Sequence, residues 1–307
     1  TLLSALVTST ATSENYENDF QGVVIRGMPA MPPFAMSMQW PVNFISTKDN
    51  SKTAYASAII DAFKNGSIDC VVPMPEDLLL DGLLDTLEEV GLSNHVIGFT
   101  RKNSFIEGDK IACKHLCHEY NIPVADKWYA VDARNYEEIL RTCLVLLDLY
   151  GGAVLKYPYS AGGKGSRIIL NSWEIKEVYD TLIKDYGKSY KQRFGKKSEW
   201  PLLIESRMSG VEISFIILID KNGNFQILPT SMDYPERFSG PASKNNPITG
   251  GMGSISPHPM ETPDLFKVLA TDIVTPLINA LKEKNMLRPC LIYPGCFLSF
   301  DDNMAPK

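Results

Sequence analysis

Short apolar runs alternate with helical stretches in the first hundred residues, and this alternation restricts the fold more than any other feature of the sequence. In this part of the chain we expect strands at 23–26, 42–45 and 68–73, and helices at 53–64 and 78–90. Such alternation predicts βαβ units around a parallel sheet, whose ligands lie beyond the carboxyl ends of the strands. Pro75 and Glu76 follow the third run, so we expect them beside a ligand.

The charge balance argues against one class of partner. The chain has a formal net charge of −6 and a pI near 5.4, so it lacks the basic excess of a nucleic-acid binder. We expect small-molecule partners, no nucleic acid and no membrane association, since no apolar run of about 18 residues occurs. Six cysteines are too sparse for a disulfide framework, which favours a cytoplasmic protein. We expect a monomer or a weak homodimer.

The amino terminus reads as the middle of a buried element, because Thr1 stands where a Met would and an apolar run follows at once. We therefore expect this sequence to be a piece of a longer protein. Further along, a domain boundary is expected near 100–125. The later elements expected are helices at 107–120, 173–184 and 262–284, the last interrupted at Pro276. Strands are expected at 153–156, 167–170, 202–205 and 212–219, and a surface excursion at 184–197.

A glycine-rich turn after a strand lysine is the strongest local signal. Lys156 ends an expected strand, and the turn that follows contains Gly162, Gly163, Lys164 and Gly165. A lysine at a strand end points a fixed charge into a cleft, while glycines let backbone N–H groups approach phosphate oxygens closely. No Ser or Thr follows Lys164, so this is not the nucleotide-binding P-loop pattern. The alternative is an ordinary hairpin turn.

Two glutamates seven residues apart form the second signal. Glu205 and Glu212 lie at expected strand ends on either side of a glycine turn. One carboxylate can accept from an adenine amino group and the other from ribose hydroxyls. The alternative is a hairpin with two solvated glutamates.

These segments, together with Lys110 at the start of an expected helix, resemble the ATP-grasp superfamily. In that superfamily one lysine precedes a small lid domain, a second lies in a lid strand before a glycine-rich loop, and a glutamate pair holds the adenosine. The resemblance implies that Lys110 and Lys156 contact the α- and β-phosphates of ATP, and that 162–165 closes over them. Glu205 and Glu212 would then hold adenine and ribose.

The fold that this resemblance implies is α/β, of the α+β ATP-grasp type. It consists of an N-terminal parallel α/β domain over 1–100, with its first strand missing, followed by an ATP-grasp domain over 101–307. The lid subdomain is expected at about 125–200, and the C-terminal part of the domain is expected to be missing.

Within the superfamily, the chain is similar to the phosphoribosylamine–glycine ligase family. The segments that carry this similarity are Pro75-Glu76, 105–110, 121–123, Asp233, Tyr293-Pro294-Gly295 and the substrate loop with Thr249, Gly250, Gly251, Met252 and Gly253. The family counterparts place Glu76, Asp233 and the 249–253 loop on the substrate side. They place Tyr293 to Gly295 along the adenine pocket, and we add Phe297 to the nucleotide contacts. The implied reaction joins glycine to phosphoribosylamine through an acyl phosphate, in purine synthesis.

Departures from the family pattern keep two alternatives open. The family's Asp-His-Lys is Asp233-Tyr234-Pro235 here, and Ile248 replaces an asparagine. These changes favour an ATP-grasp ligase with another carboxylate and amine. In addition, the chain ends at Lys307 before the family's Mg²⁺ ligands, so the ATP and Mg²⁺ cofactors imply ligands beyond Lys307. A non-catalytic nucleotide-binding relative is the second alternative.

Two further groups have simpler interpretations. Cys113, His115, Cys117 and His118 lie within six consecutive positions of one helix, and four such ligands cannot converge tetrahedrally on one metal ion. They are interpreted as packed thiols and surface histidines. His258 lies between two prolines and is interpreted as a turn residue rather than as a general base.

Overall fold

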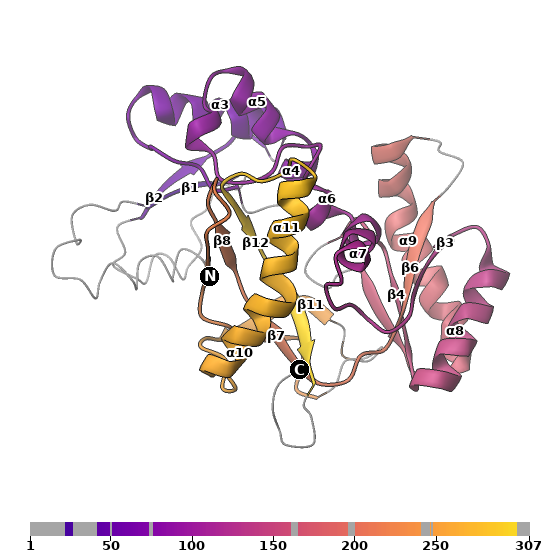
Figure 1. Ribbon diagram of the computed structural model, residues 1–307. Coiled ribbons are helices and arrows are strands. Elements are labelled where there is room, and N and C mark those ends of the chain that lie inside the picture. Colours follow the sequence, from indigo (N-terminus) through magenta and orange to yellow (C-terminus); the bar gives the residue numbers. More distant parts are fainter. Residues whose placement is uncertain are drawn as a thin grey trace. The chain divides into compact units, whose positions relative to one another are not determined.

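The computed structural model describes residues 22–26, 42–49, 51–73, 76–160, 165–195, 200–240, 246 and 248–299. The chain divides into two compact units (Figure 1). The first consists of Thr1–Ser104, Leu218–Leu228 and Arg288–Leu291, and the second of Phe105–Ile217, Pro229–Leu287 and Ile292–Lys307. Neither unit is therefore one continuous segment of the sequence.

The first unit begins with the parallel strand pair expected from the sequence. Strand β1 (Gly22–Arg26) pairs in parallel with β2 (Val42–Ser46), and helix α3 (Lys52–Lys64) follows. Ser51 caps this helix by accepting a backbone N–H of its first turn, the usual role of serine at that position. The expected α/β character of this region is confirmed.

The helix expected at 78–90 is instead two short helices. They are α4 (Glu76–Leu80) and α5 (Leu83–Glu89), and Gly82 between them is left-handed with a φ of 82°. A left-handed residue cannot continue a right-handed helix, so the chain turns there. Both helices place leucines in a core shared with α3.

The prediction of a strand over 68–73 was also wrong in its extent. Of these residues only Val71 makes a strand-type contact, a parallel bridge to Val96.

A separate three-stranded sheet contains β8 (Ile217–Ile219), β9 (Phe225–Ile227) and β12 (Cys290–Ile292), in the order β12-β8-β9.

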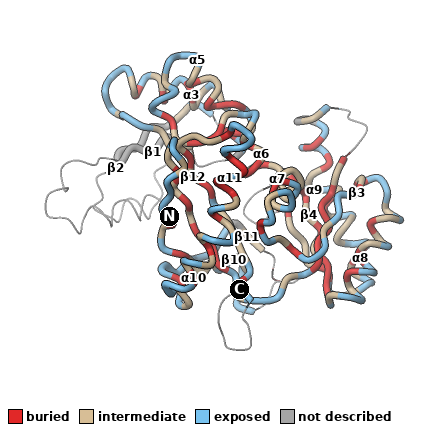
Figure 2. Tube along the Cα trace, in the orientation of Figure 1, coloured by how far each residue is buried: buried red, intermediate tan, exposed pale blue. Residues whose placement is uncertain are grey.

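The second unit contains a four-stranded antiparallel sheet, here called the lid sheet. Its strands are β3 (Trp128–Asp132), β4 (Ala153–Lys156), β5 (Ser166–Ile169) and β6 (Pro201–Ser206), in the order β3-β6-β4-β5. The expected hairpin of β4 and β5 is confirmed. Buried residues are concentrated along β6 and alternate with partly buried ones along β4 (Figure 2).

Two helices cover one face of the lid sheet. One of them corresponds to no element expected from the sequence. Helix α8 (Tyr136–Tyr150) was not expected, and α9 (Ile175–Phe194) continues about ten residues past its expected end. The surface excursion expected at 184–197 was therefore largely wrong. Its apolar residues Tyr186, Tyr190 and Phe194 pack against the core cluster or belong to it, together with the inward residues of α8 and the sheet.

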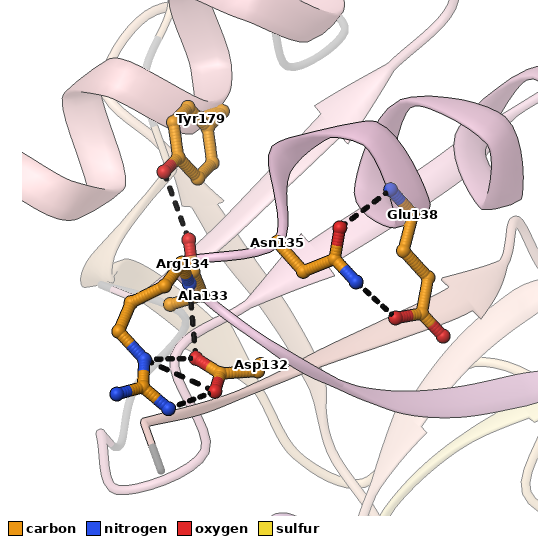
Figure 3. A network of polar contacts seen from close by, with 6 residues as sticks. All are labelled: Asp132, Ala133, Arg134, Asn135, Glu138 and Tyr179. Carbon is orange, nitrogen blue, oxygen red and sulfur yellow. Dashed lines mark hydrogen bonds and ion pairs between the residues drawn. The ribbon is translucent and has the colours of Figure 1, made fainter. Parts of the chain in front are cut away.

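Polar contacts fix the start of α8 against β3 and α9 (Figure 3). Asn135 caps α8 by accepting the N–H of Glu138 at 3.2 Å and donates to its carboxylate at 2.8 Å. The guanidinium of Arg134 donates from Nε to Asp132 at 2.9 Å. From α9, the hydroxyl of Tyr179 donates to the carbonyl of Ala133 at 2.8 Å. The β3–α8 turn is thus held from both sides.

The rest of the second unit consists of short helices and two strand pairs. In chain order these are α6 (Phe105–Gly108), α7 (Lys110–Glu119), β7 (Val211–Ser214), β10 (Met232–Glu236), β11 (Ile248–Ile255), α10 (Pro263–Val268), the π-helix η3 (Leu269–Val274), α11 (Thr275–Glu283) and β13 (Gly295–Leu298). Strand β7 pairs with β13 and β10 with β11, both antiparallel. The long helix expected at 262–284 with an interruption at Pro276 is interrupted slightly earlier, by η3.

Candidate nucleotide site

The register of the lid sheet places Lys156 and Glu205 on the same face. In the β4–β6 pair, Val154 lies opposite Glu205 and Lys156 opposite Leu203. Successive side chains of a strand alternate between faces, so Lys156 and Glu205 become diagonal neighbours. The intervening Leu155 points to the other face, into the core with α8 and α9. The ammonium of Lys156 forms an ion pair with the Glu205 carboxylate.

A second lysine reaches the same carboxylate from α7. Lys114 forms an ion pair with the other oxygen of Glu205. Asp109 caps α7 by accepting the N–H groups of Ile111 and Ala112 at 3.0 and 3.1 Å. The sequence analysis missed Lys114, although it lies four residues, about one helical turn, after Lys110 and therefore on the same side of the helix.

The Glu205 carboxylate is held in its ionised form despite its burial. Its side chain is 1% exposed, against 15% for Lys114 and 20% for Lys156. Burial by itself raises the pKa of Glu205, but the ammonium groups of Lys156 and Lys114 outweigh this effect and lower the pKa below its ordinary value. Two ammonium groups on one carboxylate leave one positive charge uncompensated within this cluster. Such an excess favours an anionic ligand.

The first turn of α7 is joined to the segment before the glycine-rich turn. The backbone N–H of Lys110 donates to the carbonyl of Pro158 at 3.1 Å, and its ammonium contacts the carbonyl of Ser160. The structure therefore brings Lys110, Lys114 and Lys156 to one end of the lid sheet.

Hydrogen bonds join the two ends of the glycine-rich turn. The N–H of Tyr157 donates to the carbonyl of Gly165 at 2.8 Å, and the hydroxyl of Ser160 to the carbonyl of Tyr157 at 3.1 Å. A Cβ on Gly165 would lie 1.9 Å from the Ser160 oxygen, so only glycine fits. Tyr159 packs against Phe194 of α9, with ring centroids 4.5 Å apart. The predicted residues Gly162, Gly163 and Lys164 lie outside the described residues.

A second polar cluster contains two of the predicted carboxylates. One oxygen of Asp233 accepts from the hydroxyls of Ser214 and Tyr293 at 2.7 and 2.8 Å. Burial raises the pKa of Asp233, but hydroxyl donors, Ser214 first among them, outweigh it and the pKa is lowered. Glu212 shows the opposite shift, because burial and the negative charge of Asp233 raise its pKa.

Lys156 interacts electrostatically with both the Glu205 cluster and the cluster around Asp233 and Glu212. Its positive charge acts on Glu212 as well as on Glu205, opposing the rise in the Glu212 pKa. Glu212 lies opposite Phe297 in the β7–β13 pair, and Phe297 is partly exposed. The structure thus brings the predicted Lys156, Glu205, Glu212 and Phe297 into one region of the second unit.

The predicted substrate loop is a strand. Residues Thr249 to Gly253 belong to β11, where Gly253 lies opposite Tyr234 of β10. The hydroxyl of Thr249 donates to the carbonyl of Pro235 at 2.8 Å and accepts the N–H of Gly251 at 3.1 Å. Met252 is 61% exposed, so its side chain is available for contact. Nothing is described of Gly250 beyond its place in this strand.

One of the remaining predicted residues belongs to the first unit, and the histidines serve the fold. Glu76 begins α4 in the first unit, and its side chain is not among the described ones. His115 packs edge-on against Trp128, with centroids 4.9 Å apart. His258 is buried, and its Nδ1 accepts the N–H of Met260 at 2.9 Å, as in a structural turn.

Among the described residues, no group of three or more His, Cys, Asp or Glu side chains could hold a metal ion. The described part of the chain also contains no helix that is long and apolar enough to cross a membrane.

Comparisons with known proteins place this geometry in a family. Residues 108–307 match the family described as phosphoribosylglycinamide synthetase, ATP-grasp (A) domain. A phosphoribosylamine–glycine ligase of Caldanaerobacter subterraneus is 30% identical over 232 residues, which cover 76% of this chain and 51% of that protein. The bifunctional purine biosynthetic protein ADE5,7 of Saccharomyces cerevisiae is 31% identical over 234 residues, or 76% of this chain and 27% of that protein.

Solved structures share the fold at lower identity. The phosphoribosylamine–glycine ligase of Thermotoga maritima has a TM-score of 0.58 at 20% identity and covers 92% of this chain and 66% of that one. The chain spans about half the length of the Caldanaerobacter relative. The fold is that of the ATP-grasp proteins, as expected. Because the family match takes in well over half of the sequence, the chain belongs to the phosphoribosylglycinamide synthetase family, within its ATP-grasp domain.

Proposed function

We propose that this chain contains the ATP-binding part of a ligase that joins glycine to phosphoribosylamine in purine synthesis. The observation that carries the proposal is the cluster of Lys114, Lys156 and Glu205, which has an excess positive charge next to a glycine-rich turn. Family membership supports the choice of reaction. The substrates of this proposal are small molecules.

In the proposed reaction, a glycine carboxylate oxygen attacks the γ-phosphorus of ATP in line, and the bond to the bridging oxygen breaks to release ADP. The amine of phosphoribosylamine then attacks the acyl carbon, phosphate leaves with the bonding electrons, and the amine loses a proton. Lys156 and Lys110 provide positive charge for the phosphates. The turn over 162–165 excludes water, which would otherwise hydrolyse the acyl phosphate.

ATP is proposed to enter with Mg²⁺. Support comes from a 2-oxoglutarate carboxylase domain of Hydrogenobacter thermophilus with this fold, which was solved with MgADP. The described residues do not fit a complete site for the ion, so no step is assigned to it. Glu205 and Glu212 are proposed on the adenosine side, with Phe297 beside Glu212.

The acceptor side is proposed to lie around Asp233 and the strand 249–253. Asp233 is ionised and held by hydroxyl donors, so it can bind an amine or ammonium group. Glu76 is proposed to contact substrate as well. The neighbouring Tyr234 is 44% exposed and stands where the family has histidine, which favours a different carboxylate or amine as the second candidate.

Coupled ADP release tests the proposal. Given ATP, Mg²⁺, glycine and freshly prepared phosphoribosylamine, the whole ligase that contains this chain is expected to release ADP. Omission of either co-substrate is expected to abolish the release. Hydroxylamine should trap the glycyl phosphate as a hydroxamate. ADP release with another carboxylate and amine only would reject the purine assignment and keep the ligase class. ATP binding without any trapped acyl phosphate would instead support a non-catalytic relative.

A further inference from the structure

The cluster around Glu205 contains one more lysine than charge neutrality requires. Three elements supply its members: Lys114 comes from α7, Lys156 from β4 and Glu205 from β6. Each lysine is paired with a different oxygen of one almost fully enclosed carboxylate. Removal of either lysine would still leave Glu205 with one partner. Neutralisation of Glu205 therefore does not explain why a second lysine is present.

The cost of breaking a buried ion pair supplies that reason. A carboxylate this enclosed is strongly destabilised when it loses its only partner. If Lys156 were that only partner, it could meet a phosphate only by leaving Glu205 unpaired. With Lys114 also bound to Glu205, Lys156 can exchange the carboxylate for a phosphate oxygen while Glu205 stays paired.

The surroundings of the two lysines decide which one moves. Lys156 is the more exposed of the two and directly precedes the segment that leads into the glycine-rich turn. Its field also reaches Glu212 on β7. Lys114 instead acts on the thiols of Cys113 and Cys117 on its own helix. The greater exposure of Lys156 and its place before the glycine-rich turn favour Lys156 as the lysine that turns to a phosphate, while Lys114 stays on Glu205.

We propose that Lys114 is a positioning residue that retains Glu205 and thereby releases Lys156 for the phosphates of the nucleotide. This inference rests on the proposed ATP site. It assigns Lys114 no contact with ATP, and it predicts that the effect of removing Lys114 depends on the presence of the Glu205 carboxylate.

The decisive experiment compares single and double variants for binding of a non-hydrolysable ATP analogue by calorimetry. In Lys114→Met the affinity is expected to fall about tenfold, because Lys156 becomes the sole partner of Glu205. In the double variant Lys114→Met/Glu205→Gln the affinity should match that of Glu205→Gln alone, because a neutral amide no longer captures Lys156. Lys114→Arg should bind nearly as well as the wild type, since arginine also pairs with a carboxylate.

A matched control is Lys284→Met. Lys284 forms an ion pair with Glu119 at 2.9 Å, also within the second unit, but it lies outside the cluster. Its replacement should leave the affinity unchanged. Thermal unfolding should show all variants folded, and if Lys114→Met does not fold, Lys114→Gln takes its place in the same comparison.

Two outcomes would overturn the inference. One is an unchanged affinity in folded Lys114→Met. The other is a double variant that binds about tenfold more weakly than Glu205→Gln alone, which would place Lys114 itself on the nucleotide or in a purely structural role. Failure of the wild-type protein to bind the analogue would be a different result, because it would reject the proposed ATP site itself.

Discussion

At the scale of single residues, charge and burial explain the site better than side-chain type alone. Lys156 and Glu205 are ordinary strand residues until the register of β4 and β6 sets them on one face. Because the Glu205 carboxylate is enclosed, losing its cationic partner would strongly destabilise the fold. The same two residue types on an exposed hairpin would interact only weakly.

Replacement of Lys156 by alanine tests this charge directly. Binding of ATP is expected to weaken at least about tenfold, or about 1.4 kcal/mol, because a fixed charge at the phosphates is lost. Glu205 keeps Lys114, so the fold should survive. Calorimetry on the folded variant measures the change. An unchanged affinity would remove Lys156 from the nucleotide site.

At the scale of elements, the β7–β13 pair depends on one close backbone approach. Gly210, just before β7, has a φ of 136°, and a Cβ built on it would lie 2.4 Å from the carbonyl oxygen of Leu298. Both the left-handed backbone and the lack of space favour glycine here. The pair positions Glu212 opposite Phe297, so this approach helps to build the candidate site.

Gly210→Ala is therefore expected to destabilise the protein by about 2 kcal/mol or more. The matched control is Gly295→Ala at the other end of the same strand pair, where nothing lies within 4 Å of the added Cβ. This control should change the free energy of unfolding little. Chemical denaturation of both variants measures the difference, and equal stability of the two would show that the approach to Leu298 relaxes without cost.

At the scale of the whole molecule, the two units are built from interleaved segments. The first unit takes β9 and most of β8 and β12 from parts of the sequence far beyond residue 104. Within that unit, the N–H of Gly98 donates to the carbonyl of Pro289 at 2.9 Å, and Arg288 pairs with Glu88 at 2.7 Å. Local segments alone therefore do not complete this unit.

A fragment of residues 1–104 is expected not to fold cooperatively. It lacks the later strands, the Pro289 carbonyl that accepts from Gly98 and the Arg288 side chain that pairs with Glu88. Circular dichroism during heating should show a sharp transition for the intact chain and a gradual one for the fragment. A cooperative transition of the fragment would mean that 218–228 and 288–291 are dispensable.

The sequence by itself predicted the features that depend on local chemistry. The β1–β2 pair with its following helix and the β4–β5 hairpin were predicted because apolar periodicity and glycine turns are encoded within a few residues. The family was predicted from the resemblance of short motifs to those of known ligases. Helix α8 was missed even though Asn135 provides a cap. The break at Gly82 was missed as well, since a glycine within a helical pattern does not reveal its φ.

Only the tertiary structure decided how distant residues share one site. Lys114 and Glu205 are far apart in sequence, and their contact depends on how α7 packs against the lid sheet. The segment 249–253 was expected to be a loop because it resembles the family's substrate loop, but it pairs with β10 as a strand although glycine has low strand propensity. Propensity is a property of neighbouring residues, whereas ion pairs and strand pairing are set by packing between segments, which no local pattern records.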